Sequence, residues 1–214
     1  MHQHNQPLTR INAERQLTIM RDIIATQELF PTHPPLPPGF RHVPDFLSEA
    51  EENRLLRSIS KFDLHPMIFQ GFEAKRKVIS FGYDYSFDRR ILTKGKPIPP
   101  DFQWLLDKTA AQLKIDNDFA ELLITEYPPG AVINWHRDAP PFDVIAGISL
   151  LGECIFRFRP FDKKKQNRKS IISLPLPTRS LYLMQGESRE EWQHSILPVN
   201  TTRYSVTLRT LRGV

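Results

Sequence analysis

From residue 77 onward the chain is a succession of short segments rich in β-branched and aromatic residues, separated by Gly, Pro, Asn and Asp. Such a pattern is typical of strands joined by turns. Two helices are expected beside them: residues 48–61, where Ser48 and Glu51 have the spacing of a capping box, and residues 101–113, after three closely spaced prolines. The pattern predicts an α+β, mainly β, fold built around a β-sandwich. The expected strands cover 77–85, 121–127, 144–151, 154–159, 170–174, 180–184, 192–197 and 203–210.

The N-terminal part has a different pattern. Residues 11–30 place apolar side chains at Ile19, Met20, Ile23 and Ile24, which predicts an amphipathic helix. Five prolines follow between Pro31 and Pro38, and proline at this density favours an extended linker. We therefore expect an N-terminal extension with a Pro-rich linker over 1–38 and one domain over 39–214.

Composition excludes several classes of protein. The chain has 214 residues, 40% apolar and 25% charged, as in folded globular proteins. It has no apolar run long enough for a membrane span and no basic-then-apolar leader at its start. The one cysteine, Cys154, excludes an internal disulfide framework and a multi-cysteine zinc site. We expect a cytoplasmic monomer.

Positive charge is concentrated in one window. Residues 157–179 hold eight Lys or Arg and one acid, a net +7, whereas the whole chain is +5. The rest of the chain is therefore slightly acidic. Such a window suits a polyanionic partner such as nucleic acid; the alternative is a solvated basic loop.

One short motif suggests a metal site. One residue, Arg137, separates His136 from Asp138, so alternation places both of their side chains on the same face of a strand or extended turn. With His194 they would form the two-histidine, one-carboxylate set of non-haem Fe(II) oxygenases, which leaves coordination positions open. The alternative is a surface His–Asp pair without a metal.

A second motif lies in the C-terminal segment. Arg203 and Arg209 are separated by an even offset, so on one strand both guanidinium groups face the same side. Inside a sandwich they would need anions, and a dicarboxylate such as 2-oxoglutarate would satisfy both. In the alternative arrangement Val206 and Leu208 are buried and the arginines are solvated.

Taken in order, these motifs resemble the AlkB family of Fe(II)/2-oxoglutarate dioxygenases. The resemblance extends over residues 40–212 and includes the Gly82–Ser86 run, Tyr127-Pro-Pro-Gly130, Gly186-Glu-Ser-Arg189 and the segment RYSVTLR. It implies a double-stranded β-helix (jelly-roll) core with flanking helices. It also implies Fe(II), 2-oxoglutarate and O₂ as cofactor and cosubstrates. By position, the implied roles are His136, Asp138 and His194 for iron and Arg203, Arg209, Tyr127, Thr125 and Ser205 for 2-oxoglutarate.

The resemblance also implies a nucleic-acid substrate. Tyr83 and Tyr85 occupy the positions of the family's nucleotide-recognition lid, Arg76 or Trp135 would stack on the base, and the lysines of the basic window would contact phosphates. The expected reaction is oxidative demethylation of N-alkylated bases of the 1-methyladenine or 3-methylcytosine type, as in DNA repair, with release of formaldehyde, succinate and CO₂. Single-stranded DNA or RNA is the expected partner. The expected phosphate contacts are Lys163, Lys164 and Lys165.

Three alternatives stay open at this point. Pro140 stands where DNA-repair members often carry a base-reading acid, which leaves room for tRNA or a non-nucleic-acid substrate with the same chemistry. A catalytically silent nucleic-acid-binding module would have no need of the three ligands together. A zinc hydrolase with these ligands would have no role for the arginine pair.

Overall fold

The computed structural model describes residues 35–69, 72–87 and 89–213. The helix expected over 11–30 and nearly all of the expected extension lie outside these residues, so the boundary near residue 38 stays a prediction. Within the described part of the chain, no helix is long and apolar enough to cross a membrane.

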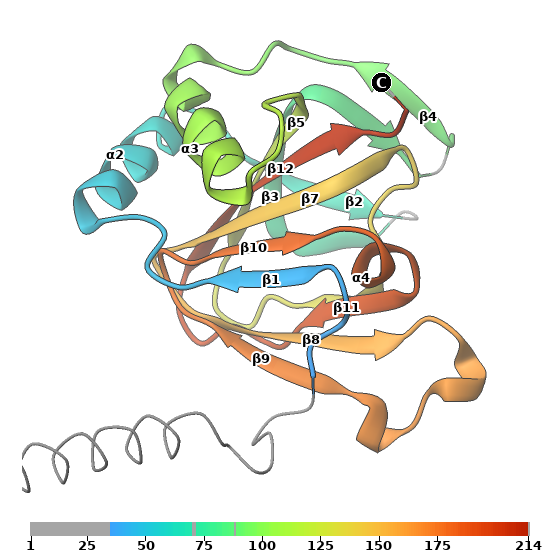
Figure 1. Ribbon diagram of the computed structural model, residues 1–214. Helices are drawn as coiled ribbons and strands as arrows, with labels where there is room; N and C mark the ends of the chain where they lie inside the picture. Colours follow the sequence, from blue (N-terminus) through green and yellow to red (C-terminus); the bar gives the residue numbers. More distant parts are fainter. Residues whose placement is uncertain (1–34, 70–71, 88, 214) are drawn as a thin grey trace, which may run out of the picture. The chain divides into compact units, whose positions relative to one another are not determined.

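The described strands form two antiparallel sheets, as expected for a mainly β jelly roll (Figure 1). The large sheet has the order β1-β10-β7-β12-β5-β3-β2, with β4 paired to β3, and the small sheet has the order β6-β11-β8-β9. The large sheet comprises β1 (Phe40–Val43), β2 (His65–Phe69), β3 (Phe72–Ser86), β4 (Ile91–Lys94), β5 (Phe119–Tyr127), β7 (Phe142–Leu150), β10 (Leu181–Met184) and β12 (Arg203–Leu211). The small sheet comprises β6 (Ile133–His136), β8 (Cys154–Pro160), β9 (Ile172–Leu176) and β11 (Trp192–Ile196).

Two helices cover the outside of the large sheet, α2 (Glu49–Ile59) and α3 (Gln103–Leu113) (Figure 1). The expected capping box is present: the backbone N–H of Glu51 donates to Ser48 Oγ at 3.2 Å, and that of Ser48 donates to Glu51 Oε2 at 2.8 Å. The prolines before α3 lead into the 3₁₀ turn η1 (Pro100–Phe102). Leu55 of α2 and Leu105 of α3 are fully buried in the core between the helices and the sheet.

A second core fills the space between the two sheets. It contains an aromatic group in which the rings of Phe40, Phe156, Phe158 and Tyr182 contact one another. Cys154 is buried there as a free thiol. This core supports the strands that carry the candidate site.

Strand β12 lies in the middle of the large sheet, between β5 and β7, and is covered on both faces. Val206 and Leu208 are buried in the helix-side core, while Arg203 and Arg209 are on the opposite face. The structure thus combines the inward arginines of the first arrangement with the buried Val206 and Leu208 of the second, because a central strand is covered on both faces; the solvated arginines of the second arrangement are not observed.

Sequence reasoning found the long strands and missed four short ones. β1, β2 and β4 of the large sheet and β6 of the small sheet were not expected as strands, and β3 begins five residues before the expected start. The remaining short elements are the 3₁₀ turns η2 (Lys163–Lys165) and η3 (Arg168–Ser170) between β8 and β9, and α4 (Glu187–Glu190) before β11.

Candidate active site

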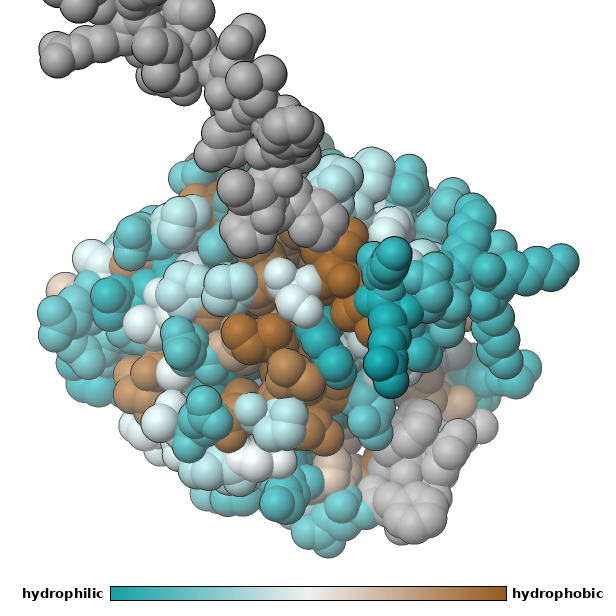
Figure 2. Space-filling view, turned by 90° about the horizontal axis from the view of Figure 1, so that it is seen from below, coloured by the Kyte–Doolittle hydropathy of each residue, from teal (hydrophilic) through white to brown (hydrophobic). Residues whose placement is uncertain are grey.

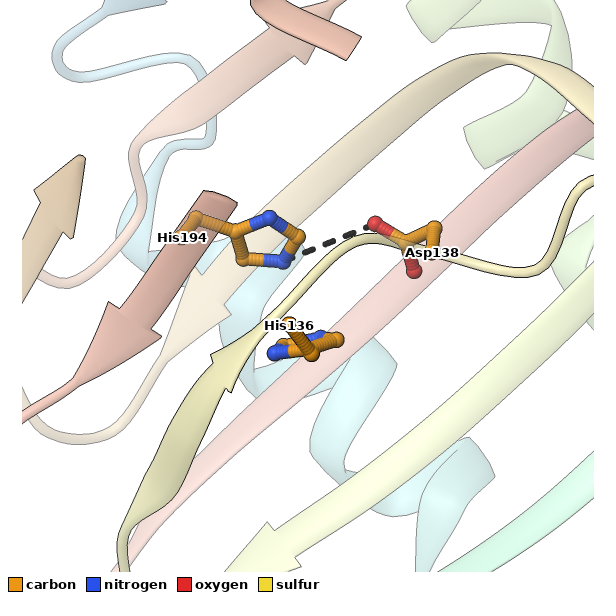
Figure 3. A group of neighbouring side chains, drawn as sticks. All are labelled: His136, Asp138 and His194. Carbon is orange, nitrogen blue, oxygen red and sulfur yellow. Dashed lines mark ion pairs between the residues drawn. The ribbon is translucent and has the colours of Figure 1, made fainter. Parts of the chain in front are cut away.

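His136, Asp138 and His194 lie together between the sheets (Figure 3). His136 ends β6 and faces His194 directly across the β6–β11 pair, while Asp138 follows β6 by two residues. One nitrogen or oxygen atom from each side chain lies within 4.8 Å of the others. Nε2 of His194 is 3.5 Å from Oδ2 of Asp138, and the two imidazole centroids are 4.2 Å apart. The predicted triad is thus assembled.

The protonation states of the triad suit metal binding. Burial and the neighbouring His136 lower the pKa of His194 to about 3, and burial also lowers the pKa of His136. Burial opposes ionisation of Asp138, but Arg209 and the two histidines hold the pKa of its carboxyl below its usual range. Two neutral imidazoles and one carboxylate result, which are the states in which these groups bind a metal.

Hydrogen bonds and packing orient each ligand. Nδ1 of His136 lies 2.8 Å from the carbonyl oxygen of Asn134, so an N–H there leaves Nε2 free as a ligand. The ring of Phe156 stacks on that of His194 at 5.2 Å. Oδ2 of Asp138 is buried without a hydrogen-bond partner among the described residues. A buried acceptor of this kind beside two neutral imidazoles fits a metal ion well.

Arg209 joins the metal-site carboxylate to a second buried acid. Its Nη2 donates to Oδ1 of Asp138 at 2.7 Å, and its Nη1 donates to Oε2 of Glu121 at 2.6 Å. The hydroxyl of Ser80 donates to the other oxygen of Glu121 at 3.1 Å. The anions that meet Arg209 are thus already supplied by the protein, and its Nε is the atom left without a partner in the described structure.

Arg203 has a different environment. Its side chain is 1% exposed, and its Nε donates to Ser149 Oγ at 2.9 Å. Its guanidinium carbon lies 4.8 Å from the ring centroid of Tyr127, and Nη1 has no partner among the described residues. No carboxylate in the described part of the chain forms a salt bridge with it. A buried cation of this kind requires an anionic ligand.

A cavity of about 480 Å³ connects these groups, a volume in the range of small-molecule sites. Of the residues predicted from the sequence, nine line it: His136, Asp138, His194, Arg203, Arg209, Tyr127, Thr125, Tyr85 and Arg76. Ser205 is buried beside Thr125 in the β12–β5 register but does not line the cavity. Tyr83 packs against the core between the sheets and does not line it either.

The remaining predicted residues lie elsewhere. Trp135 alternates with His136 along β6 and does not line the metal cavity. It lines a second groove of about 620 Å³, which His136 and Arg76 also line, and its stacking on a base stays a prediction. Lys163, Lys164 and Lys165 form the exposed turn η2 after β8. The three lysines are therefore not among the residues that line the cavity with the metal triad, Arg203 and Arg209.

Three functional residues were not singled out as such from the sequence. Glu121 pairs with Arg209 in the β5–β12 register, and Tyr127 pairs with Arg203. Glu121 and Tyr127 are six residues apart, as are Arg203 and Arg209, and this matching spacing could have indicated Glu121 as the partner of Arg209. Arg189 is buried and donates from Nη2 to the carbonyl oxygens of Asp138 (3.1 Å), Ala139 (2.7 Å) and Phe142 (3.2 Å). Tyr182 lines the cavity with a buried ring. Arg189 thus holds the backbone of residues 138–142, the segment that carries Asp138.

Comparison with known proteins agrees with this geometry. Residues 39–212 match the family model described as the 2OG-Fe(II) oxygenase superfamily. The tRNA (carboxymethyluridine(34)-5-O)-methyltransferase alkbh8 of Xenopus tropicalis is 32% identical over 199 residues, which are 90% of this chain and 29% of that protein. The "Alkylated DNA repair protein ALKBH8 homolog" of Arabidopsis thaliana is 31% identical over 82% of this chain and 59% of that protein.

The chain thus spans less than two thirds of these relatives. The solved structure of OsALKBH1 superposes with a TM-score of 0.63 at 14% identity, covering 83% of this chain and all of that one, and shows the same fold. The match over nearly the whole described domain, together with the His-Asp-His site, establishes the family. The chain belongs to the 2OG-Fe(II) oxygenase superfamily, as an AlkB-family dioxygenase that uses Fe(II), 2-oxoglutarate and O₂.

Proposed function

We propose that this dioxygenase removes N-alkyl groups from nucleic-acid bases of the 1-methyladenine or 3-methylcytosine type. The observation that carries the proposal is that one cavity joins the metal triad, Arg203, which has no salt-bridge partner among the described residues, and the aromatic and cationic residues Tyr85 and Arg76. The basic window on the same domain adds affinity for a polyanion.

Each residue of the site has a role in this reaction. His136, Asp138 and His194 would hold Fe(II), with Arg209 fixing the orientation of the Asp138 carboxylate. Arg209 borders the triad and Arg203 lies at the other end of the same strand face, so Arg203 would bind the distal carboxylate of 2-oxoglutarate. When bound, Fe(II) and 2-oxoglutarate use O₂ to hydroxylate a C–H bond and release succinate and CO₂. A hydroxylated N-methyl group is a hemiaminal, which releases formaldehyde and leaves the bare base nitrogen.

The substrate side of the cavity is formed by the β2–β3 hairpin. Arg76 is held against Met67, with Nε and Nη2 at 3.2 and 2.7 Å from Sδ. Its planar guanidinium can stack on a base that has left its own stack, and Tyr85 borders the same space beside Phe87. Pro140 brings no carboxylate to the position where DNA-repair members often have an acid, but the cavity is also lined by the carboxylate of Asp84 and the hydroxyl of Thr93.

Transfer RNA is a second candidate polymer. It is favoured by the printed names of the relatives from Xenopus tropicalis and Mus musculus, which describe tRNA modification, both with 32% identity to this chain. The chemistry proposed for the cavity is unchanged. A cytoplasmic location and a monomeric state stay predictions of the sequence.

The test is reconstitution under anaerobic conditions with Fe(II) and 2-oxoglutarate, followed by air, in the presence of methylated single-stranded DNA or RNA. Mass spectrometry follows succinate and the loss of one methylene unit from the oligonucleotide, with His136→Ala as the inactive control. Loss of the methyl group in the wild type only supports the proposal, and comparison of the polymers identifies the preferred one. Succinate without any change in either oligonucleotide contradicts the proposed substrate while leaving the oxygenase in place.

A further inference from the structure

The small sheet has two faces, and the active site uses only one of them. His136, His194 and Phe156 point into the cavity from β6, β11 and β8. Successive side chains of a strand point to opposite faces, so the residues between them belong to the outer face. These are Trp135 on β6, Gln193 and Ser195 on β11, and Arg157 and Arg159 on β8, in the register Ser195–Arg157 and Gln193–Arg159.

Two arginines lie against one tryptophan on this outer face. The guanidinium carbons of Arg157 and Arg159 are 4.8 and 4.7 Å from the ring centroid of Trp135. Each is held by a neutral group through its Nε: Arg157 donates to Ser195 Oγ at 3.1 Å and Arg159 to Gln193 Oε1 at 2.8 Å. In the described part of the chain neither arginine forms a salt bridge. Both charges are therefore ordered without a protein anion.

The mutual position of the two charges favours an anion from outside. Burial and the charge of Arg157 lower the pKa of the Arg159 guanidinium below its ordinary value. Two cations fixed beside one ring repel each other, and a phosphate bound by both would turn that repulsion into attraction. Ser195 and Gln193 are neutral, so both arginines keep their positive charge for a phosphate. A carboxylate partner would have neutralised one of them.

The cluster continues into the loop between β8 and β9. This loop carries Lys163–Lys165 and the cations of η3, whereas its one acid, Asp162, accepts the backbone N–H of Lys164 at 2.9 Å. The guanidinium of Arg137, the residue after His136, lies 3.6 Å from the ring centroid of Phe161 in this loop. This contact joins the loop to the end of β6. Figure 2, seen from below Figure 1, shows hydrophilic side chains extending on the side where this loop lies.

We propose that the outer face of the small sheet, with Arg157 and Arg159 around Trp135 and the lysine loop beside them, is a second nucleic-acid surface that binds backbone phosphates. The inference rests on the proposed function and extends it. The phosphates bound here belong to nucleotides away from the one in the cavity, because Arg157 and Arg159 project from the face of β8 opposite Phe156, which lines the cavity. Arginines and lysines supply the charge that binds the phosphates.

This geometry requires a substrate that reaches both sides of the sheet. A pentanucleotide whose modified base is in the cavity offers few further phosphates to the outer face. A folded RNA, or a strand with long flanks, can bind both. The outer face therefore selects long or folded substrates by affinity, without changing the reaction in the cavity.

The test uses Arg157→Gln/Arg159→Gln and, separately, Lys163→Gln/Lys164→Gln/Lys165→Gln in the full chain. The matched control is Arg54→Gln/Arg57→Gln on α2, which removes two exposed arginines, one of them also placed over a tryptophan, Trp104. Fluorescence anisotropy measures binding of an unmodified RNA hairpin with long flanks and of a pentanucleotide over a range of salt concentrations. Thermal melting checks that each variant is folded. The three lysines are exposed, so their replacement should leave the fold intact even if the arginine variant is destabilised.

Both outer-face variants should bind the long RNA more weakly, and the slope of log K against log salt should fall by about 1 for each lost phosphate contact. Pentanucleotide binding should change much less than that of the long RNA, and the control variant should match the wild type. Unchanged binding of long RNA, an equal loss in the control, or an equal loss for the pentanucleotide would overturn the inference, as would binding of anionic vesicles in place of RNA. Weaker long-RNA binding without any demethylation contradicts the proposed function alone, whereas demethylation with unchanged long-RNA binding contradicts this inference alone.

Discussion

Arg209 donates to Asp138 across 2.7 Å and leaves the other oxygen of that carboxylate without a hydrogen-bond partner in the described structure. One oxygen is thus used to fix the side chain and the other is presented to the metal site. Because Arg209 also binds Glu121, the metal-site carboxylate is linked through one guanidinium to an acid in the interior of the large sheet. The two arginines of β12 are therefore different. Arg209 is part of the protein's own ion network, whereas Arg203 forms no salt bridge among the described residues.

Arg209→Gln should destabilise the protein strongly, even without cofactors. The substitution leaves Glu121 and Asp138 buried without their cation, and removal of one partner from a buried ion network costs about 3–5 kcal/mol. Urea unfolding monitored by circular dichroism measures the loss. Arg54→Gln, at an exposed position on α2, is the control; it loses only a cation–π contact with Trp104 and should change the free energy of unfolding by at most about 1 kcal/mol. Equal stabilities of the two variants would contradict the assigned network.

Arg203→Gln should have the opposite balance of effects. The variant removes a buried charge that has no salt-bridge partner among the described residues, so its stability without ligand should stay near that of the wild type or rise. Its affinity for 2-oxoglutarate should fall, because the distal carboxylate loses its partner. Thermal melting with and without 2-oxoglutarate measures both effects, since a ligand that binds only the folded state raises the melting temperature. A full ligand-induced shift in the variant would exclude Arg203 as the carboxylate partner.

Glu52 should make the stability of the domain depend on pH. Burial opposes ionisation of this residue, but hydrogen bonds from Leu151 N–H (2.7 Å), Thr178 Oγ1 (2.6 Å) and Arg179 hold its pKa below the ordinary value. A lowered folded-state pKa means that the stabilisation is present above the pKa of an unfolded glutamate, about 4.3, and is lost as the pH falls through the folded-state value.

Glu52→Gln should therefore cost about 1–3 kcal/mol near pH 7 and much less in acid. Urea unfolding at neutral pH and at a pH below the unfolded value measures the difference. Glu49→Gln, at an exposed position of the same helix, is the matched control and should have little effect at either pH. A cost that does not change with pH would show that packing, not the carboxylate charge, is responsible.

Gly147→Ala should disturb the wall of the cavity. A Cβ at this position would lie 2.1–2.4 Å from ring atoms of Tyr182, which is directly opposite on β10 and packs on Phe156. Overpacking of this kind costs about 1–3 kcal/mol and would push the phenol ring toward the cavity, weakening 2-oxoglutarate binding. Gly95→Ala, where the nearest atom is 3.4 Å away, is the control. Tyr182→Leu in the Gly147→Ala background should restore stability, and a purely additive loss in the double variant would refute the clash.

Local signals predicted the parts of the structure that depend on local interactions. The capping box at Ser48 and the alternation along β12 are of this kind, and so is the placement of His136 and Asp138 close together at the end of β6. The pairing of Arg209 with Glu121 joins residues 88 positions apart, so the matching spacing on the two strands becomes informative only once their register is known. Trp135 alternates with its neighbour His136 along β6 and so faces Arg157 and Arg159, and its contact with a base stays a prediction.

The central position of β12 has a consequence for how the chain folds as it is made. β5 pairs with β3, and β7 pairs with β10, but these two groups of strands are joined in the large sheet only through β12, which follows all of them in the chain. While residues 203–211 are still within the ribosome, both β5 and β7 therefore expose an unpaired edge, the kind of surface through which partly folded chains associate. Synthesis of one segment then closes the sheet and delivers Arg203 and Arg209 to the cavity in a single step.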